Sequence, residues 1–342
     1  MDRTTIVRGP ALVTYNSQTI YSQGDITITW HTEMFDVATA RFGPQTDKRA
    51  KDRWAEITFT PAGEWTKCVA ALWPYTSTNA GASVCGATDK TLVIHSYWIG
   101  NTGVDDPVIT FANAFVQKQP DINFAATKVM VGAVTFKAIT ALAGSYSASD
   151  NGFVTMAANT VAPTDTFAPG DVITQPYTGT WAVNTYTTAP TDGTTPWTAF
   201  RTQDGFQVSF DVTMEPVETD TDGLIDYTFA SQIVTAKCMP VGMNLQAVLR
   251  QTPMQYWGAT GTGSAFPVGR GVSMSGRGAL LSINDMTSPT PVHYFYLNNA
   301  ALVSAGERYG MTTLRHGEIM WQAMRHISAG TDAALFSIMP GA

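Results

Sequence analysis

The sequence predicts a mainly β protein that is built from two similar halves. Apolar and polar residues alternate with a period of two along much of the chain, and these stretches are rich in Thr, Val, Ile and aromatic residues. A set of weak matches also relates the first half of the chain to the second. A length of 342 residues agrees with two domains, at roughly 150 residues per domain.

Nine segments have the alternation and the length of β-strands: 24–30, 54–60, 90–98, 128–139, 205–214, 225–237, 278–285, 292–304 and 317–327. Two other segments, Glu64–Trp73 and Met243–Arg250, carry apolar residues at helical spacing. Each of the two follows a proline-x-glycine corner and ends near a second proline, at Pro74 and Pro253. Because proline cannot continue a helix, each half is predicted to hold one short helix beside its strands.

The two halves align in order, with a nearly constant offset. At an offset of 180 residues, SQGDITIT (22–29) falls on TQDGFQVS (202–209) and Gly43 falls on Gly223. The offset is 179 for the two helices and their proline corners. It is about 185 for GAVTFKAI (132–139) on GEIMWQAM (317–324). The order of these matches predicts an internal duplication.

This duplication gives the predicted domain organisation. Domain 1 covers residues 1–145 and domain 2 covers residues 178–342. The segment 146–177 between them is rich in Gly, Ser, Thr, Pro and Ala, which is typical of a linker.

The composition excludes several classes of protein. The net charge of −7 argues against wrapping of nucleic acid, which needs a basic face, and the three cysteines contain no C-x-x-C pair. No signal peptide and no long apolar run are found, so we expect a protein without a membrane span, made in a reducing cytoplasm. Only 14% of the residues are charged, which suits a surface that packs against copies of itself.

No arrangement of residues points to an enzyme, a metal site or a cofactor. The five histidines are scattered, without the convergent ligands that zinc needs. The glycine-rich segment 258–271 lacks the Gly-Lys-Ser/Thr ending of a phosphate-binding loop, and no serine lies in a G-x-S-x-G motif. We therefore expect no catalytic residue and no cofactor.

Two segments at equivalent places in the halves carry opposite charge. Segment 41–53 has five basic and two acidic side chains, and segment 215–226 has five acidic and no basic ones. They are either two solvated loops, or a basic loop that meets an acidic loop of a neighbouring domain and sets the register of stacked rings. The candidate contact residues are Arg41, Lys48, Arg49, Lys51, Arg53, Glu215, Glu218, Asp220, Asp222 and Asp226.

The order of motifs resembles one family of proteins. A strand, a long charged hairpin and a strand ending in FTPAGEW are followed by a short helix, the run KTLVIH…ITFANAF and the closing GAVTFKAI. This pattern resembles the major tail proteins, or tail tube proteins, of bacteriophages with long non-contractile tails. The resemblance is best over 8–140 and weaker over 180–327.

The resemblance implies a β-sandwich or barrel domain with one flanking helix and a long hairpin. Such domains join their sheet edges in rings of six, and a chain with two domains would form a homotrimeric, pseudo-hexameric ring. The rings would stack as the tail tube of a virion, assembled in the host cytoplasm, with DNA passing through the lumen without specific binding. The tape measure, tail terminator and distal tail proteins would be its partners.

A second interpretation is a tandem β-sandwich that binds carbohydrate or a cell surface. The chain has 9 Trp and 12 Tyr, and exposed aromatic rings of this kind serve as stacking platforms for sugars.

Overall fold

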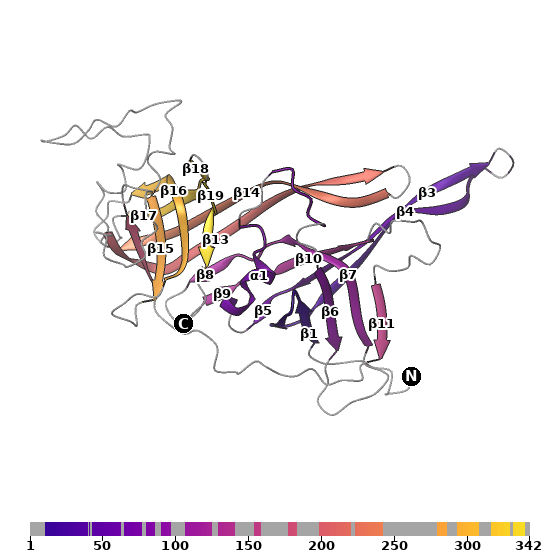
Figure 1. The fold of residues 1–342 in the computed structure, drawn as a ribbon, viewed down its shortest axis with the longest axis horizontal. Coiled ribbons are helices and arrows are strands. Elements are labelled where there is room, and N and C mark those ends of the chain that lie inside the picture. Colours follow the sequence, from indigo (N-terminus) through magenta and orange to yellow (C-terminus); the bar gives the residue numbers. More distant parts are fainter. Residues whose placement is uncertain are drawn as a thin grey trace, which may run out of the picture.

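The computed structural model is mainly β, with antiparallel strands in two large sheets and one small one, and it is consistent with a β-sandwich (Figure 1). The residues that it describes are 11–39, 41, 43–62, 65–76, 80–85, 90–96, 107–124, 129–140, 154–158, 177–182, 198–219, 223–241, 279–285, 293–307, 316–328 and 331–338.

The first sheet comes mainly from the first third of the chain. Its strands are, in spatial order, β3 (Thr27–Thr39), β4 (Gly43–Phe59), β10 (Val134–Ile139), β7 (Pro107–Lys118), β6 (Lys90–Ser96), β1 (Ala11–Tyr15), β2 (Gln18–Ser22) and β5 (Pro61–Ala62). A ninth strand, β11 (Val154–Ala158), pairs with β7. This ninth strand lies within the segment that the sequence assigns to a linker.

The second sheet combines strands from both halves. In spatial order it contains β12 (Tyr177–Ala182), β15 (Ala279–Asp285), β16 (His293–Glu307), β17 (His316–Ala323), β14 (Gly223–Val241), β13 (Thr198–Thr219), β8 (Ile122–Phe124) and β9 (Val129–Val131). Strand β20 (Phe336–Ile338) pairs with β16, while β18 (His326–Ser328) and β19 (Thr331–Ala333) form a separate pair. Strands β8 and β9 therefore connect the first half of the chain to the sheet of the second half.

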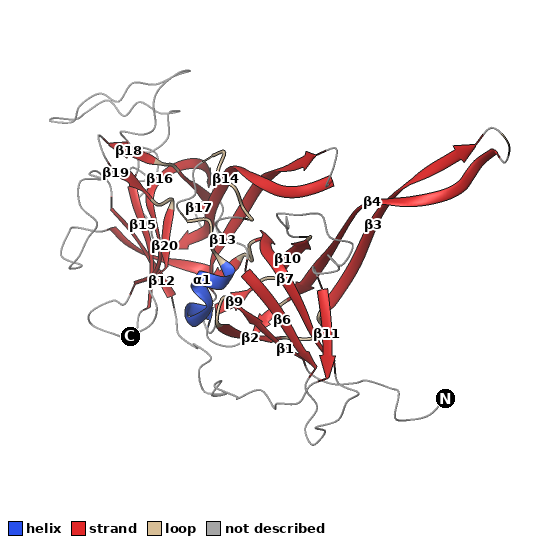
Figure 2. Ribbon diagram, turned by 45° about the vertical axis from the view of Figure 1, so that its right-hand side comes forward, coloured by secondary structure: helices blue, strands red, loops and turns tan. Residues whose placement is uncertain are grey.

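The helix predicted near residue 65 is present. A 3-10 turn at Trp65–Cys68 continues directly into α1 (Val69–Leu72), and the helix lies between the two large sheets (Figure 2). The helix predicted at Met243–Arg250 lies outside the described residues.

Two of the predicted strands are each divided into two strands in the structure. The segment 128–139 forms β9 and β10, which belong to different sheets, because the chain turns at Gly132, whose N–H donates to the Asp121 carbonyl at 2.7 Å. The segment 317–327 ends its first strand at Ala323 and begins β18 at His326. The two charged segments are parts of paired strands rather than loops, since 41–53 lies mostly in β4 and 215–226 spans the ends of β13 and β14.

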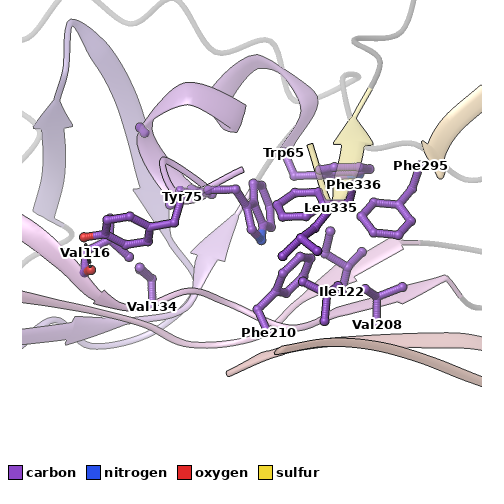
Figure 3. Packing of buried hydrophobic residues seen from close by; sticks show 14 of the residues in the cluster. Trp65, Tyr75, Val116, Ile122, Val134, Val208, Phe210, Phe295, Leu335 and Phe336 are labelled. Carbon is purple, nitrogen blue, oxygen red and sulfur yellow. Dashed lines mark hydrogen bonds between the residues drawn. The ribbon is translucent and has the colours of Figure 1, made fainter. Parts of the chain in front are cut away.

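One hydrophobic core runs across both large sheets. Trp65 and Trp73 pack edge to face at 5.5 Å between ring centroids, and Trp73 continues the contact to Phe210 of β13 at 6.1 Å. Phe210 in turn contacts Phe295 and Phe336 (Figure 3). Burial of large aromatic rings is the main source of stability in such a core, so the short helix holds the two sheets together.

Candidate self-association surface

The two large sheets share one strand order. Along the path β3-β4-β10-β7-β6-β1 of the first sheet, each strand has a counterpart on the path β13-β14-β17-β16-β15-β12 of the second. Pairing registers also agree, since Ile28 lies opposite Ile57 in the first sheet and Val208 opposite Ala236 in the second, at the offsets read from the sequence.

The agreement extends to the irregularities of the long hairpins. The β3–β4 hairpin changes register between Glu33 and Met34, and the β13–β14 hairpin changes register between Thr213 and Met214. The closing strands agree as well, because Phe136 lies opposite Ile57 and Trp321 lies opposite Ala236. Equivalent positions of the two sheets can therefore be compared residue by residue.

Within the chain, strand β13 is covered on its outer edge. Strand β8 pairs with it over Phe206, Gln207 and Val208. The side chains of Phe206, Val208 and Phe210 on its core face are at most 4% exposed, because Trp73 and Phe124 of the first half close the core above them. We call this arrangement the edge junction.

The equivalent strand β3 is the terminal strand of the first sheet, and no second strand flanks it among the described residues. Its Ile28 is only partly buried, where the matching Val208 has no exposure. Trp30, which matches Phe210, contacts Phe111 at 5.7 Å but is 48% exposed. Further along β3, Met34 and Phe35 are also exposed. An edge strand of this length that exposes apolar side chains is a template for pairing with another chain.

A second junction forms where the β13–β14 hairpin crosses the first sheet. By outer face we mean the side of each sheet that carries the side chains alternating with its core residues; in the first sheet it includes Trp54, Glu56, Lys137 and Ile139. Tyr227 of the hairpin contacts this face, since Lys137 Nζ donates a hydrogen bond to its hydroxyl. The Tyr227 ring also lies 5.3 Å from the ring of Phe115.

Near the tip of the β13–β14 hairpin, the contacts of this second junction are polar. The Leu224 N–H donates to Asp52 Oδ1 at 2.7 Å, and Lys51 Nζ lies 3.5 Å from Glu218 Oε2. Residues 81–84 run beside β14, so that Gly81 and Val84 donate backbone hydrogen bonds to the carbonyls of Phe229 and Tyr227. We call this second arrangement the hairpin junction.

Burial and local charge shift several pKa values at the hairpin junction. Burial lowers the pKa of Lys137 and raises the pKa of Tyr227 to about 12. Burial also acts to raise the pKa of Asp226, but hydrogen bonds from Ser83 and from the N–H groups of Cys85 and Tyr227 outweigh it and lower the pKa. Glu218 and then Glu33 raise the pKa of the exposed Lys51. The neutral phenol and the Asp226 carboxylate are therefore the forms present near neutral pH.

The charged residues singled out from the sequence take different positions. Lys51 meets Glu218 within one chain, whereas Lys48 forms an ion pair with Asp36 of its own hairpin at 3.3 Å. Asp226 accepts hydrogen bonds from Ser83 and Cys85. Exposed positions are occupied by Arg41, Arg53 and Glu215, while the side chain of Arg49 and the residues Asp220 and Asp222 lie outside the described part of the structure. Pairing of these charges between rings stays a prediction.

The residues that matter most at the edge junction could not be ranked from the sequence. Trp30 lies in a predicted strand, but the alternation of that strand does not tell a covered edge from an open one. The alignment of the two halves indicates the importance of this position, because it carries a large aromatic residue in both, Trp30 in one half and Phe210 in the other.

Among the residues that the structure describes, no cluster of three or more His, Cys, Asp and Glu side chains is arranged to hold a metal ion. No helix within this described part is long and apolar enough to cross a membrane.

Neither the protein-family models nor the curated proteins compared with this chain gave a match.

Proposed function

We propose that this protein is a structural subunit that assembles head to tail with copies of itself into rings, and that the rings stack as a tube. The chain is then a tandem of two tail-tube-like domains that arose by duplication, and three chains supply the six domains of a ring. The resemblance to tail tube proteins adds the setting, a virion tail through whose lumen DNA passes without specific binding.

One observation carries the proposal. Strands β3 and β13 occupy the same place in two sheets of the same order and register, but among the described residues a further strand covers the edge of β13 and none covers that of β3. Two apolar side chains of β3 match side chains that the edge junction buries: the partly buried Ile28 matches Val208, and Trp30, at 48% exposure, matches Phe210, at 4%. A second copy whose second half contacts β3, as the first half contacts β13 within one chain, repeats the edge junction between chains.

Such a contact joins two different surfaces of the protein, and is therefore heterologous. Heterologous contacts continue from copy to copy until the assembly closes as a ring or extends as a filament. Closure pairs the β3 edge of every copy, which removes the aggregation risk of a long edge strand with exposed apolar side chains.

The test is assembly of the purified protein and of an edge variant. Mass photometry and negative-stain electron microscopy are expected to show rings or tubes with three chains per layer. Ile28→Lys puts a charge on the core face of β3 and is expected to leave folded single chains. Thr155→Lys places the same charge on exposed β11 and serves as the matched control. A wild-type protein that stays a single chain at high concentration overturns the proposed function.

A further inference from the structure

We propose that the outer face of the second sheet is the docking site for the β3–β4 hairpin of another copy of this chain. The inference rests on the proposed function and adds a second, separate interface to the edge pairing described above. The hairpin, called the arm below, comprises β3 and β4 from Met34 to Ala50, and it projects from the body of the molecule (Figure 1).

The hairpin junction provides the template. There the β13–β14 hairpin lies on the outer face of the first sheet, where Asp52 and Lys137 are each 7% exposed and Ile139 is 1% exposed. Its tip approaches closely at Gly223, since a Cβ on this residue would lie 2.0 Å from Asp52 Oδ1. The face of the first sheet is therefore already occupied by the chain's own second hairpin.

The same face of the second sheet is less buried at its described positions. By register Ser231, Ile233 and Gln322 take the places of Asp52, Trp54 and Lys137. Ser231 is exposed and Ile233 is 44% exposed, while Gln322 is only partly buried. Met324, which takes the place of the buried Ile139, is only partly buried as well.

The arm has the matching features at its own equivalent positions. Gly43 takes the place of Gly223, and Asp47 takes the place of Asp226. Met34, which matches the partly buried Met214, is 56% exposed on the arm. The arm thus resembles the hairpin that binds the first sheet, and no described surface of its own chain binds the arm in the same way.

Charge complementarity favours the second copy as the occupant. The Lys51–Glu218 ion pair of the hairpin junction is replaced at the second site by Ala230 on the face and Ala38 on the arm, so neither charge is left alone. In the Lys137–Tyr227 contact the cation lies on the face. At the second site the equivalent residues are Gln322 on the face and Lys48 on the arm, so the cation lies on the arm. Both substitutions avoid an unpaired or repelling charge.

Paired cysteines test the docking directly in the full-length protein. Gly223→Cys with Asp52→Cys forms the internal control, because these two positions are in contact within one chain, so that a disulfide is expected to close without a second copy. Gly43→Cys with Ser231→Cys is the test pair, and here the disulfide is expected to join different chains. Each single-cysteine variant corrects for the native Cys68, Cys85 and Cys238.

Assembled protein with the test pair is expected to give covalent dimers and larger oligomers on non-reducing gels, and single-cysteine variants are expected to give none. Rings or tubes that form normally but yield no such oligomers, while the control pair closes within the chain, overturn the arm docking and leave the proposed function intact. Failure of the wild type to assemble overturns the proposed function instead.

A second variant needs no disulfide. Ile233→Glu alters a side chain that is 44% exposed, so its melting temperature is expected to match that of the wild type while assembly needs at least tenfold more protein. Met156→Glu changes an exposed apolar residue on β11 and is the matched control. Unchanged assembly of Ile233→Glu, with the wild-type melting temperature, also contradicts the docking.

Discussion

Replacement of Trp30 and of Phe210 by alanine should separate assembly from folding. The two residues occupy the same register position in their sheets, but Trp30 is 48% exposed and Phe210 is 4% exposed. If the edge junction recurs between chains, the exposed half of Trp30 is buried only on assembly. Phe210 has already completed its contacts within the chain.

The size of the effect follows from buried area. A tryptophan side chain buries up to about 250 Å², so its exposed half contributes about 120 Å², or about 3 kcal/mol at about 25 cal/mol per Å². Trp30→Ala is therefore expected to weaken the association constant roughly 150-fold. Phe210→Ala removes a buried ring and is expected to lower the free energy of unfolding by about 3–5 kcal/mol, with a much smaller effect on association.

Two measurements decide the matter. Sedimentation velocity over a range of concentrations gives the association constant, and urea unfolding gives the stability of each variant under the same conditions. Trp30→Ala also loses the buried half of its side chain, so some loss of stability is expected, but the chain should remain folded at 25 °C. An association constant that is unchanged in Trp30→Ala would refute the reasoning, as would equal effects of both variants on assembly.

Three further predictions concern the hairpin junction. Gly223→Ala should lower the free energy of unfolding by about 1–3 kcal/mol, because Gly223 has a φ of +69° and faces Asp52, and it should cost more than Gly81→Ala, where φ is +86° but the space is open; equal losses in urea unfolding would argue against the close contact. The lowered pKa of Asp226 means that its carboxylate stabilises the fold above the ordinary value of 3.8 and that this contribution is lost as the pH falls through the folded-state pKa; the stability gap between wild type and Asp226→Asn should therefore shrink in acid, and a gap independent of pH would contradict the assignment. Lys137→Met keeps an unbranched side chain of similar length and removes the ammonium group, whose pKa burial lowers, so its stability should equal or exceed that of the wild type. Lys137→Ala also removes packing under Tyr227 and should be less stable, and thermal unfolding of both variants tests this.

The sequence alone predicted the mainly β class of the fold, and the offsets of its predicted duplication agree with the register of the strand pairs. The offsets of 180 and 179 residues place Ile28 on Val208 and Ile57 on Ala236, and these are the pairs that lie opposite one another in β3–β4 and β13–β14. Alternation and the proline corners carry this information locally, because each depends on residues close together in the chain.

The connection between the halves could not be predicted in the same way. Strand β8 has only three residues, and nothing in Ile-Asn-Phe indicates that it pairs with β13 more than 80 residues further on. The sequence left two interpretations open for the charged segments, solvated loops or contacts with a neighbouring domain, and it indicated no specific pair such as Lys51 and Glu218. The two charges meet inside one chain, because the β13–β14 hairpin reaches back over the first sheet. Such contacts depend on the path of the whole chain, which local patterns do not encode.

Within its described residues, the chain carries one copy of each junction, together with an edge strand, an outer face and an arm that match parts of them. An edge strand and an outer face are covered where the first half meets the second, and an edge strand, an outer face and an arm remain exposed. If the second junction repeats the geometry of the first, every sheet is related to the next by the same rotation, within and between chains. Three chains then close a ring only when that rotation is about 60° per sheet, whereas any other value gives a different ring or a filament. The number of chains per layer therefore measures the rotation between neighbouring sheets, which the contact between the two sheets of one chain already sets.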